Sequence, residues 1–288
     1  MITQKEIINL AEEREVPKST IDKDWVLGHY INAMYSLPEI KNNFVFKGGT
    51  CISKCYVKNY RFSEDIDLTL LDKNFTVNEK LFLKINRIAE NNSGAKFHLD
   101  FITPNVSDDV DQGYKIKIKF WGADHHPNKK PLPLERWQTS IKVDISYSEK
   151  LVLRIENKSL IHQYSDSRKI TNSISTYCLN EIIAEKIRAL VQRNRPRDIY
   201  DNWYLLSKID SIQIPKIQNV LFKKAHSKNI EIRNVEQFIN ATKKNINKNE
   251  WESSLKHQLG QNNLPDFDFV YSQLAVLLEK IINNEKQK

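Results

Sequence analysis

The stretch that decides the fold is FVFKGGTCISKCY, residues 44–56. It opens with a short apolar run that ends at Lys47, continues with the pair Gly48-Gly49, and then places apolar residues at helical spacing. An apolar run that stops at glycine predicts a buried strand, and the spacing after it predicts a helix. We therefore expect a strand, a glycine turn and a helix. At such a turn the missing side chains and the free amides of the helix N-terminus admit phosphate.

The next segment, residues 63–71 (SEDIDLTLL), alternates between apolar and polar residues. This alternation predicts a strand with one buried face and one face that carries Asp65 and Asp67. Their Cα atoms should lie about 6.6 Å apart, so both carboxylates can reach one magnesium ion. Adjacent like charges are costly unless a metal, basic groups or water compensate them. The alternative is an exposed strand face with two solvated acids.

A third acid lies in a similar pattern, Ile141-Lys142-Val143-Asp144-Ile145. The three apolar residues share one face of the expected strand, and Lys142 and Asp144 share the other. Phosphoryl transfer with metal ions commonly needs a carboxylate that helps to activate the attacking hydroxyl. Asp144 is our candidate for that role and for a metal ligand, and an ordinary exposed strand residue is the alternative.

Several donors surround the glycine turn in sequence. The hydroxyls belong to Thr50, Ser53 and Ser63, and the cations are Lys54 and Arg61. Together they could hold the phosphates of a nucleotide, although each one alone also fits a helix cap or a surface position.

Further period-two segments at residues 97–103, 115–121 and 140–147 predict more strands, and the strand signal ends near residue 170. Helical spacing then covers residues 180–193, 197–209 and 268–284, whereas the Lys/Asn-rich run at residues 242–250 is expected to be a helix end or a loop. We predict an α+β fold, with a mixed sheet flanked by helices. Its parts are a helical preface (1–40), a sheet-containing core (41–170) and a helical C-terminal domain (171–288) that completes the active site.

The helix expected at residues 180–193 carries Lys186 in the middle of its apolar face. Arg193 continues that face, so both cations could emerge at a pocket and hold phosphates, unless Lys186 simply extends along the helix to water. The next helix opens with Asp198 and Asp201. Acids are favourable in a first helical turn, but Asp198 could instead orient Lys186 or Arg193.

The amino-acid composition restricts the class of partner and the cellular compartment that we expect. The net charge of +8 favours anionic partners, and 40% hydrophobic residues over 288 positions suffice for a sizeable core. Three cysteines without metal-site spacing point to a reducing compartment. No stretch has the length and apolarity of a signal peptide or a membrane span, so we expect a soluble cytoplasmic protein without membrane contact.

These blocks resemble the AbiEii/AbiGii toxin family of nucleotidyltransferases, which is related to the MenT toxins. The matching blocks in this chain are Lys47-Gly48-Gly49-Thr50 with Ser53, Arg61-Phe62-Ser63-Glu64-Asp65-Ile66-Asp67, Val143-Asp144, and Glu185-Lys186 through Arg197-Asp198-Ile199-Tyr200-Asp201. The resemblance implies a DNA-polymerase-β-like core that uses magnesium, or manganese, and a nucleoside triphosphate. It also implies nucleotide transfer to tRNA acceptor ends and restraint by a cognate antitoxin.

By motif, Asp65, Asp67 and Asp144 would bind metal, and Lys186 and Asp198 would be the later catalytic pair. Ser63 and the Gly48-Gly49 turn would face the phosphates. The spacing between Gly49 and Asp65 is longer than in many polymerase-β-like enzymes, but it suits the toxin branch. Two alternatives stay open: the acceptor is a protein or a small molecule, or the chain is an RNA-binding module that has lost catalysis.

Overall fold

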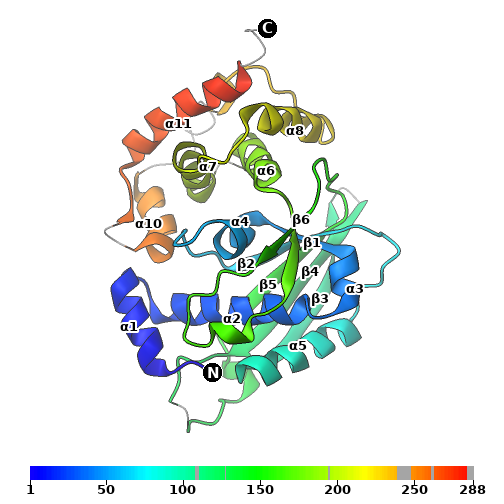
Figure 1. Ribbon diagram of the computed structural model, residues 1–288, viewed down its shortest axis with the longest axis vertical. Helices are drawn as coiled ribbons and strands as arrows, with labels where there is room; N and C mark the ends of the chain where they lie inside the picture. Colours follow the sequence, from blue (N-terminus) through cyan, green and yellow to red (C-terminus); the bar gives the residue numbers. More distant parts are fainter. Residues whose placement is uncertain (108–109, 127, 194, 239–247, 261–262, 284–288) are drawn as a thin grey trace. The chain divides into compact units, whose positions relative to one another are not determined.

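The computed structural model describes residues 1–107, 110–126, 128–193, 195–238, 248–260 and 263–283. Its internal contacts divide the chain into two compact units. The first comprises Met1–Glu149 and Ile155–Thr176, and the second comprises Lys150–Arg154 and Tyr177–Lys288. The first contains the strands and the second is helical, as the ribbon in Figure 1 shows.

The first unit is built on a seven-stranded mixed sheet in the order β3-β4-β5-β2-β1-β7-β6. The strands are β1 (Phe44–Lys47), β2 (Asp65–Leu70), β3 (Lys96–Ser107), β4 (Val110–Trp121), β5 (Ser140–Ser146), β6 (Glu156–Ser159) and β7 (Ser173–Thr176). The expected α+β fold is confirmed. The expectation that strands end near residue 170 is wrong, because β7 lies beyond it. β6 and β7 are four residues each and largely polar, too short to show a periodicity.

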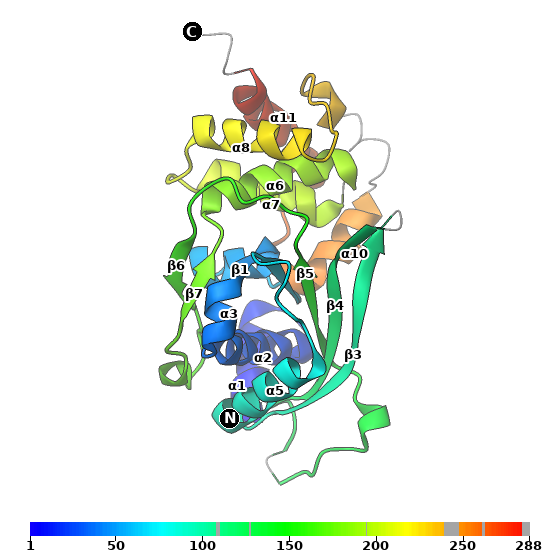
Figure 2. The ribbon, with the colours of Figure 1, turned by 90° about the vertical axis from the view of Figure 1, so that its right-hand side faces the viewer.

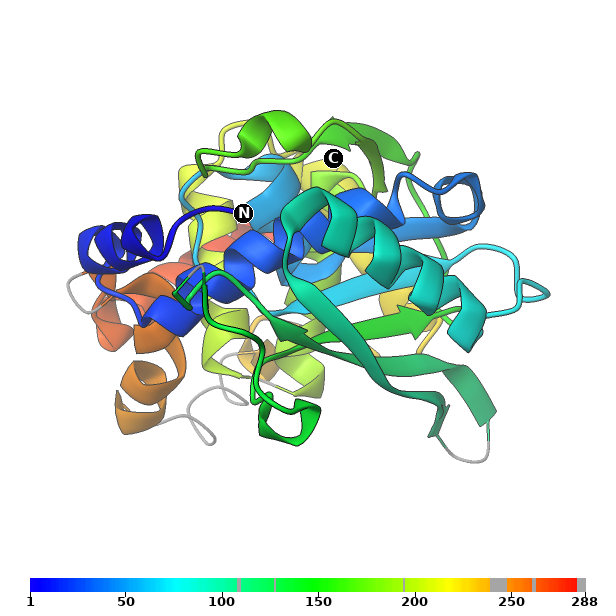
Figure 3. The same ribbon diagram turned by 90° about the horizontal axis from the view of Figure 1, so that it is seen from below.

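Helices cover one face of this sheet. α2 (Lys18–Met34) packs on α5 (Glu79–Ser93) and on β5, and α5 packs on β3. Figures 2 and 3 show both helices on the same side of the sheet. The apolar residues of the alternating strands point toward them, so that Ile66, Leu68 and Val143 are at most 1% exposed. The polar residues of β2, β4 and β5 therefore lie on the opposite face.

The expected strand, glycine turn and helix are present after residue 43. β1 leads into a single turn, α4 (Gly48–Cys51), which continues as a π-helical segment, η1 (Ile52–Tyr56). Two further helices, α1 (Gln4–Arg14) and α3 (Pro38–Asn43), belong to the same unit. Cys51 and Cys55 of this segment are buried and form no disulfide.

The second unit is a group of packed helices: α6 (Leu179–Gln192), α7 (Pro196–Lys208), α8 (Ile214–His226), α10 (Lys248–Leu259) and α11 (Phe267–Ile282). Three were expected, whereas α8 and most of α10 were not. A buried ammonium joins α8 to α6, because Lys224 Nζ lies 2.8 Å from Glu181 and 2.7 Å from Glu185. Of the run at residues 242–250, residues 242–247 lie outside the described residues and 248–250 begin α10. Within the described ranges, no helix has the length and apolarity needed to cross a bilayer.

Candidate active site

The three acids singled out in the sequence lie on neighbouring strands and on one face. β2 and β5 run parallel, with Asp67 directly beside Asp144 and Asp65 directly beside Lys142. β1 lies on the other side of β2 and places Lys47 next to Asp67. Because side chains alternate along each strand, all three carboxylates project from the face opposite α2 and α5. The sheet therefore gathers three acids that are 79 positions apart at most in the chain.

The electrostatics of Asp144 reflect this crowding. Burial, followed by the negative charge of Asp65, raises the pKa of the Asp144 carboxyl above its usual value. The charges of Lys115 and Lys142 act in the opposite direction without cancelling the rise. A cation among the acids would relieve the repulsion, and carboxylate oxygens are the ligands that Mg²⁺ and Mn²⁺ favour. The donor set fits a divalent ion.

The glycine turn lies against the acids. Gly48 has a left-handed φ of +80°, and a Cβ there would overlap the carboxylate of Asp67. A Cβ on Gly49 would come within 3.0 Å of the Ser63 hydroxyl and 3.1 Å of an Arg61 nitrogen. The sequence suggested that these missing side chains make room for phosphate. In the structure they make room for a carboxylate, a hydroxyl and a guanidinium of the chain itself.

Hydroxyl groups connect this turn to the start of β2. Thr50 is fully buried, and its Oγ1 lies 2.5 Å from the carbonyl oxygen of Asp65 and 2.9 Å from the hydroxyl of Ser63. Ser53 donates to the Thr50 carbonyl at 3.1 Å. Arg61 is only 3% exposed and donates to the Phe62 carbonyl. These contacts fix Asp65 relative to the turn, so the proposed nucleotide-binding residues also position the acids.

A pocket of about 240 Å³ opens next to these residues. Ser63 and Glu64 line it, together with Thr139 from the segment before β5 and Lys23 from α2. Lys23 forms an ion pair with Glu64 at 2.8 Å. The pocket offers space for part of a substrate beside Ser63.

Lys54, the other cation near the turn, has a structural role. It is 3% exposed, and its ammonium donates to the carboxylate of Asp24 at 2.6 Å and to the Asp24 carbonyl at 2.9 Å. The Tyr164 hydroxyl donates to the same carboxylate at 2.7 Å. The idea that Lys54 neutralises phosphates is thus not supported, because its charge is already satisfied in a buried pair. No local sequence signal connects it to Asp24, which lies 30 positions away.

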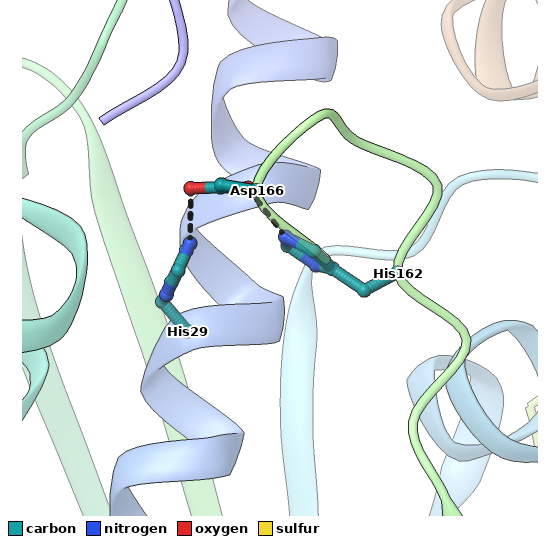
Figure 4. A group of neighbouring side chains, drawn as sticks. All are labelled: His29, His162 and Asp166. Carbon is teal, nitrogen blue, oxygen red and sulfur yellow. Dashed lines mark hydrogen bonds and ion pairs between the residues drawn. The ribbon is translucent and has the colours of Figure 1, made fainter. Parts of the chain in front are cut away.

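A separate group of metal-ligand residues was not anticipated from the sequence (Figure 4). In the described part of the chain, the group of three such residues with ligand atoms within 4.8 Å of one another is His29, His162 and Asp166. The two imidazole Nε2 atoms contact different oxygens of Asp166, at 3.0 and 3.2 Å, and the Trp25 indole donates to both oxygens.

This cluster fits a hydrogen-bonded support better than a metal centre. The Nδ1 atoms of His29 and His162 are buried and have no partner among the described residues. Metal-bound histidines almost always donate their other ring N–H to an acceptor. The Asp166 carboxylate instead accepts three side-chain donors, which outweigh its burial and lower its pKa. The cluster joins α2 to residues 162–166.

In the second unit, the cations and acids expected to act together form two separate pairs. Lys186 Nζ lies 2.5 Å from the carboxylate of Asp201, whose side chain is fully buried. Arg193 donates to both oxygens of Asp198 at 2.9 Å. Asp198 therefore orients Arg193, as one of the two expectations had it. Asp201, which the sequence also allowed to be an ordinary first-turn acid, orients Lys186.

Comparison with known proteins adds to this geometry. A family model described as "Nucleotidyl transferase AbiEii toxin, Type IV TA system" matches residues 31–273. Among solved structures, MenT4, a nucleotidyltransferase toxin from Mycobacterium tuberculosis H37Rv, is similar with a TM-score of 0.68. The alignment has 16% sequence identity and covers 98% of this chain and 90% of that chain, so the likeness is one of fold. No curated protein matches the chain.

Proposed function

The chain belongs to the AbiEii family of nucleotidyl transferase toxins, and we propose that it transfers a nucleoside monophosphate from a triphosphate to an RNA hydroxyl. The 3′ end of tRNA is the proposed acceptor. The observation that carries the proposal is the register of β2 and β5, which places Asp67 beside Asp144 on the face that also bears Asp65. Family membership supports the enzyme class, and the positive net charge favours an acceptor rich in phosphate.

In the proposed reaction, the acceptor oxygen forms a bond to the α-phosphorus as the bond to the bridging oxygen of the β-phosphate breaks. Pyrophosphate leaves, and the hydroxyl proton passes to the carboxylate of Asp144. A divalent ion, magnesium or manganese, held by Asp65, Asp67 and Asp144, would supply neutralisation of the phosphate charge. Gly48, Gly49, Thr50 and Ser63 keep these acids in place, and Ser53 and Arg61 support the turn.

The paired cations of the second unit are proposed to act on the phosphates. Lys186 would stabilise the charge that develops on the departing pyrophosphate, with Asp201 restricting its side chain. Arg193 would bind phosphate, with Asp198 holding its guanidinium through two hydrogen bonds. A cation that is already oriented loses less side-chain entropy when it binds.

As a toxin, the protein is proposed to act in the cytoplasm under the control of a cognate antitoxin. The description of the matching family, which names a type IV toxin–antitoxin system, supports this part. The three cysteines are buried and form no disulfide, which is consistent with a reducing compartment.

The test is to incubate the purified protein with magnesium, each of the four labelled nucleoside triphosphates and total tRNA. We expect label on RNA with wild type and at least a thousandfold less with Asp65→Ala. A thousandfold loss of rate corresponds to about 4 kcal/mol of transition-state stabilisation, which we attribute to the lost metal ligand. Asp72→Ala, an exposed acid just after β2, is the matched control and should label like wild type. Equal labelling by Asp65→Ala would exclude the proposed site. Label on a protein when RNA is omitted would instead favour a protein acceptor.

A further inference from the structure

The face that carries the acids continues across β5, β4 and β3 as a basic surface. In the ladder, β4 places Lys115 opposite Asp144, Lys117 opposite Lys142 and Lys119 opposite Ser140. β3 then places Phe101 opposite Lys117 and His98 opposite Lys119. Directly opposed residues of antiparallel strands point to the same side of the sheet. We call this surface the lysine face, and it comprises His98, Phe101, Lys115, Lys117, Lys119 and Lys142.

The charges on the lysine face are only partly compensated. Like charges directly opposite each other destabilise a sheet, and Lys117 and Lys142 form such a pair. Asp100, at a β-bulge, forms ion pairs with Lys117 at 3.0 Å and Lys119 at 3.5 Å. Lys115 and Lys142 are exposed and form no ion pair within the described ranges. The surface thus retains positive charge beside Asp144, where an anionic ligand would relieve the repulsion.

An exposed aromatic ring lies within this basic surface. Phe101 is 43% exposed. By contrast, Ile116 and Ile118, which flank Lys117 on β4 and point to the other face of the sheet, are at most 1% exposed. A phenyl ring on an open sheet among lysines has no role in the core. Single-stranded RNA is commonly bound in this way, with bases stacked on aromatic side chains and phosphates on cations.

We propose that the lysine face binds a single-stranded end of the acceptor RNA, with phosphates on Lys117 and Lys142 and a base stacked on Phe101. This inference rests on the proposed transfer to RNA and names the surface that presents the acceptor. Strand spacing and rise place Phe101 about 12 Å from Asp144, a distance that about two nucleotides can span. Alternate lysines on β4 recur about every 6.6 Å, close to the phosphate repeat of an extended strand. A duplex fits less well, because its bases are not free to stack on Phe101.

The first test measures binding of the full chain, without triphosphate, to a short fluorescent single-stranded RNA, to a blunt duplex of the same sequence and to an acidic peptide. We expect the single strand to bind most tightly. Phe101→Ala should weaken this binding about fivefold or more, and Phe101→Trp should retain it. Lys117→Gln/Lys142→Gln should make the negative slope of log K against log salt shallower by about 1.4, because each lost phosphate contact removes about 0.7 from its magnitude.

The control variants change the same chemistry near α5. Lys80 and Lys84 are exposed on α5, and Lys84 forms an ion pair with Glu39. Lys80→Gln/Lys84→Gln should leave the salt slope of RNA binding at the wild-type value. Leu83→Ala is the control for Phe101→Ala, because Leu83 is an apolar side chain that is 50% exposed on α5. It should leave the affinity for the single-stranded RNA at the wild-type value.

The second test measures nucleotide transfer as a function of RNA concentration. Phe101→Ala should raise the KM for RNA, while the affinity for triphosphate, measured separately, stays at the wild-type value. If wild type labels RNA and the variants have its KM and its salt slope, the lysine face is wrong and the proposed function stands. If the duplex or the acidic peptide binds as tightly as the single strand, the lysine face is likewise overturned. If wild type neither binds nor labels RNA, both proposals fail.

Discussion

The carboxylate of Asp67 lies directly against the backbone of Gly48, in the volume that a side chain at position 48 would need. Gly48 also has a φ of +80°, a conformation that residues with a Cβ adopt only with strain. One residue therefore provides both the backbone turn after β1 and the room for a candidate metal ligand. The glycine turn and the acidic strand form a single structural feature.

Gly48→Ala should affect both properties. We expect a loss of unfolding free energy greater than the roughly 1–2 kcal/mol of a left-handed alanine, because the methyl group also displaces Asp67. Nucleotide transfer should fall at least a hundredfold. Gly94→Ala is the matched control: its φ is +83° and its new Cβ would meet only Met1, at 3.5 Å. Chemical unfolding and transfer assays on both variants check this, and equal losses in the two would contradict the role of Asp67.

Removal of divalent ions should destabilise the protein. At about 100 times its Kd, magnesium should stabilise the folded state by about 2.7 kcal/mol, which raises Tm by roughly 5 °C or more. Asp144→Asn should raise the Tm measured in chelator, because it removes the repulsion with Asp65, and should abolish most of the magnesium effect. Asp72→Asn serves as the control in the same thermal scans. A full magnesium response in Asp144→Asn would count against this ligand set.

The pair between Lys186 and Asp201 should separate stability from activity. Asp201→Ala leaves a buried ammonium without its carboxylate and should cost about 3–5 kcal/mol of unfolding free energy. Lys186→Met/Asp201→Leu replaces both charges with apolar groups of similar size and should recover most of that loss. If Lys186 contacts phosphate, the double variant still transfers no nucleotide. Recovery of transfer together with stability would make Lys186 a purely structural residue.

Asp22 should make stability depend on pH. The residue is 3% exposed and accepts a hydrogen bond from the Ala123 amide at 2.7 Å. Burial raises the pKa of its carboxyl to about 6, more than the backbone donors lower it. An acid whose pKa is raised on folding binds more protons in the folded state, so its contribution is complete below pH 3.8 and is lost as pH rises through 6.

The expected loss is about 3 kcal/mol between pH 4 and pH 7, from a shift of about two pH units. Asp22→Asn keeps the acceptor oxygen but does not titrate, so the difference in unfolding free energy between wild type and variant isolates the effect. Denaturant titrations across this range measure it. The unfolding free energy of wild type minus that of the variant should fall as pH rises, and a value that stays constant or rises would contradict the assignment.

Much of the local structure was predictable, because alternation and helical spacing are properties of a few consecutive residues. The pattern around Asp65 and Asp67 predicted that both acids share one strand face, and β2 has that form. The apolar stripe around Lys186 predicted α6 within one residue at each end. Short or polar elements were not predicted, among them the strands β6 and β7, because four residues are too few to show a periodicity.

Partnerships between distant segments were decided only by the tertiary structure. The residues around Lys186 in the sequence did not predict which acid would bind it. Asp201 rather than Asp198 is its partner because of the way in which α6 packs on α7. Likewise Lys54 had the sequence neighbours of a phosphate-binding cation, but its partner Asp24 comes from α2. A side chain's neighbours across a sheet or between helices depend on pairing and packing, which a residue's own sequence neighbourhood does not encode.

The sequence by itself thus determined which residues lie on the polar face of each strand, because a period of two follows from the geometry of a single extended chain. The parallel register that sets Asp67 beside Asp144, and the ladder that extends this face to Lys117 and Phe101, arose only from the assembled sheet. Register is the collective result of hydrogen bonds and buried contacts among separate strands. Each acid could be predicted from the sequence around it, whereas the grouping of the acids into one site depends on the fold.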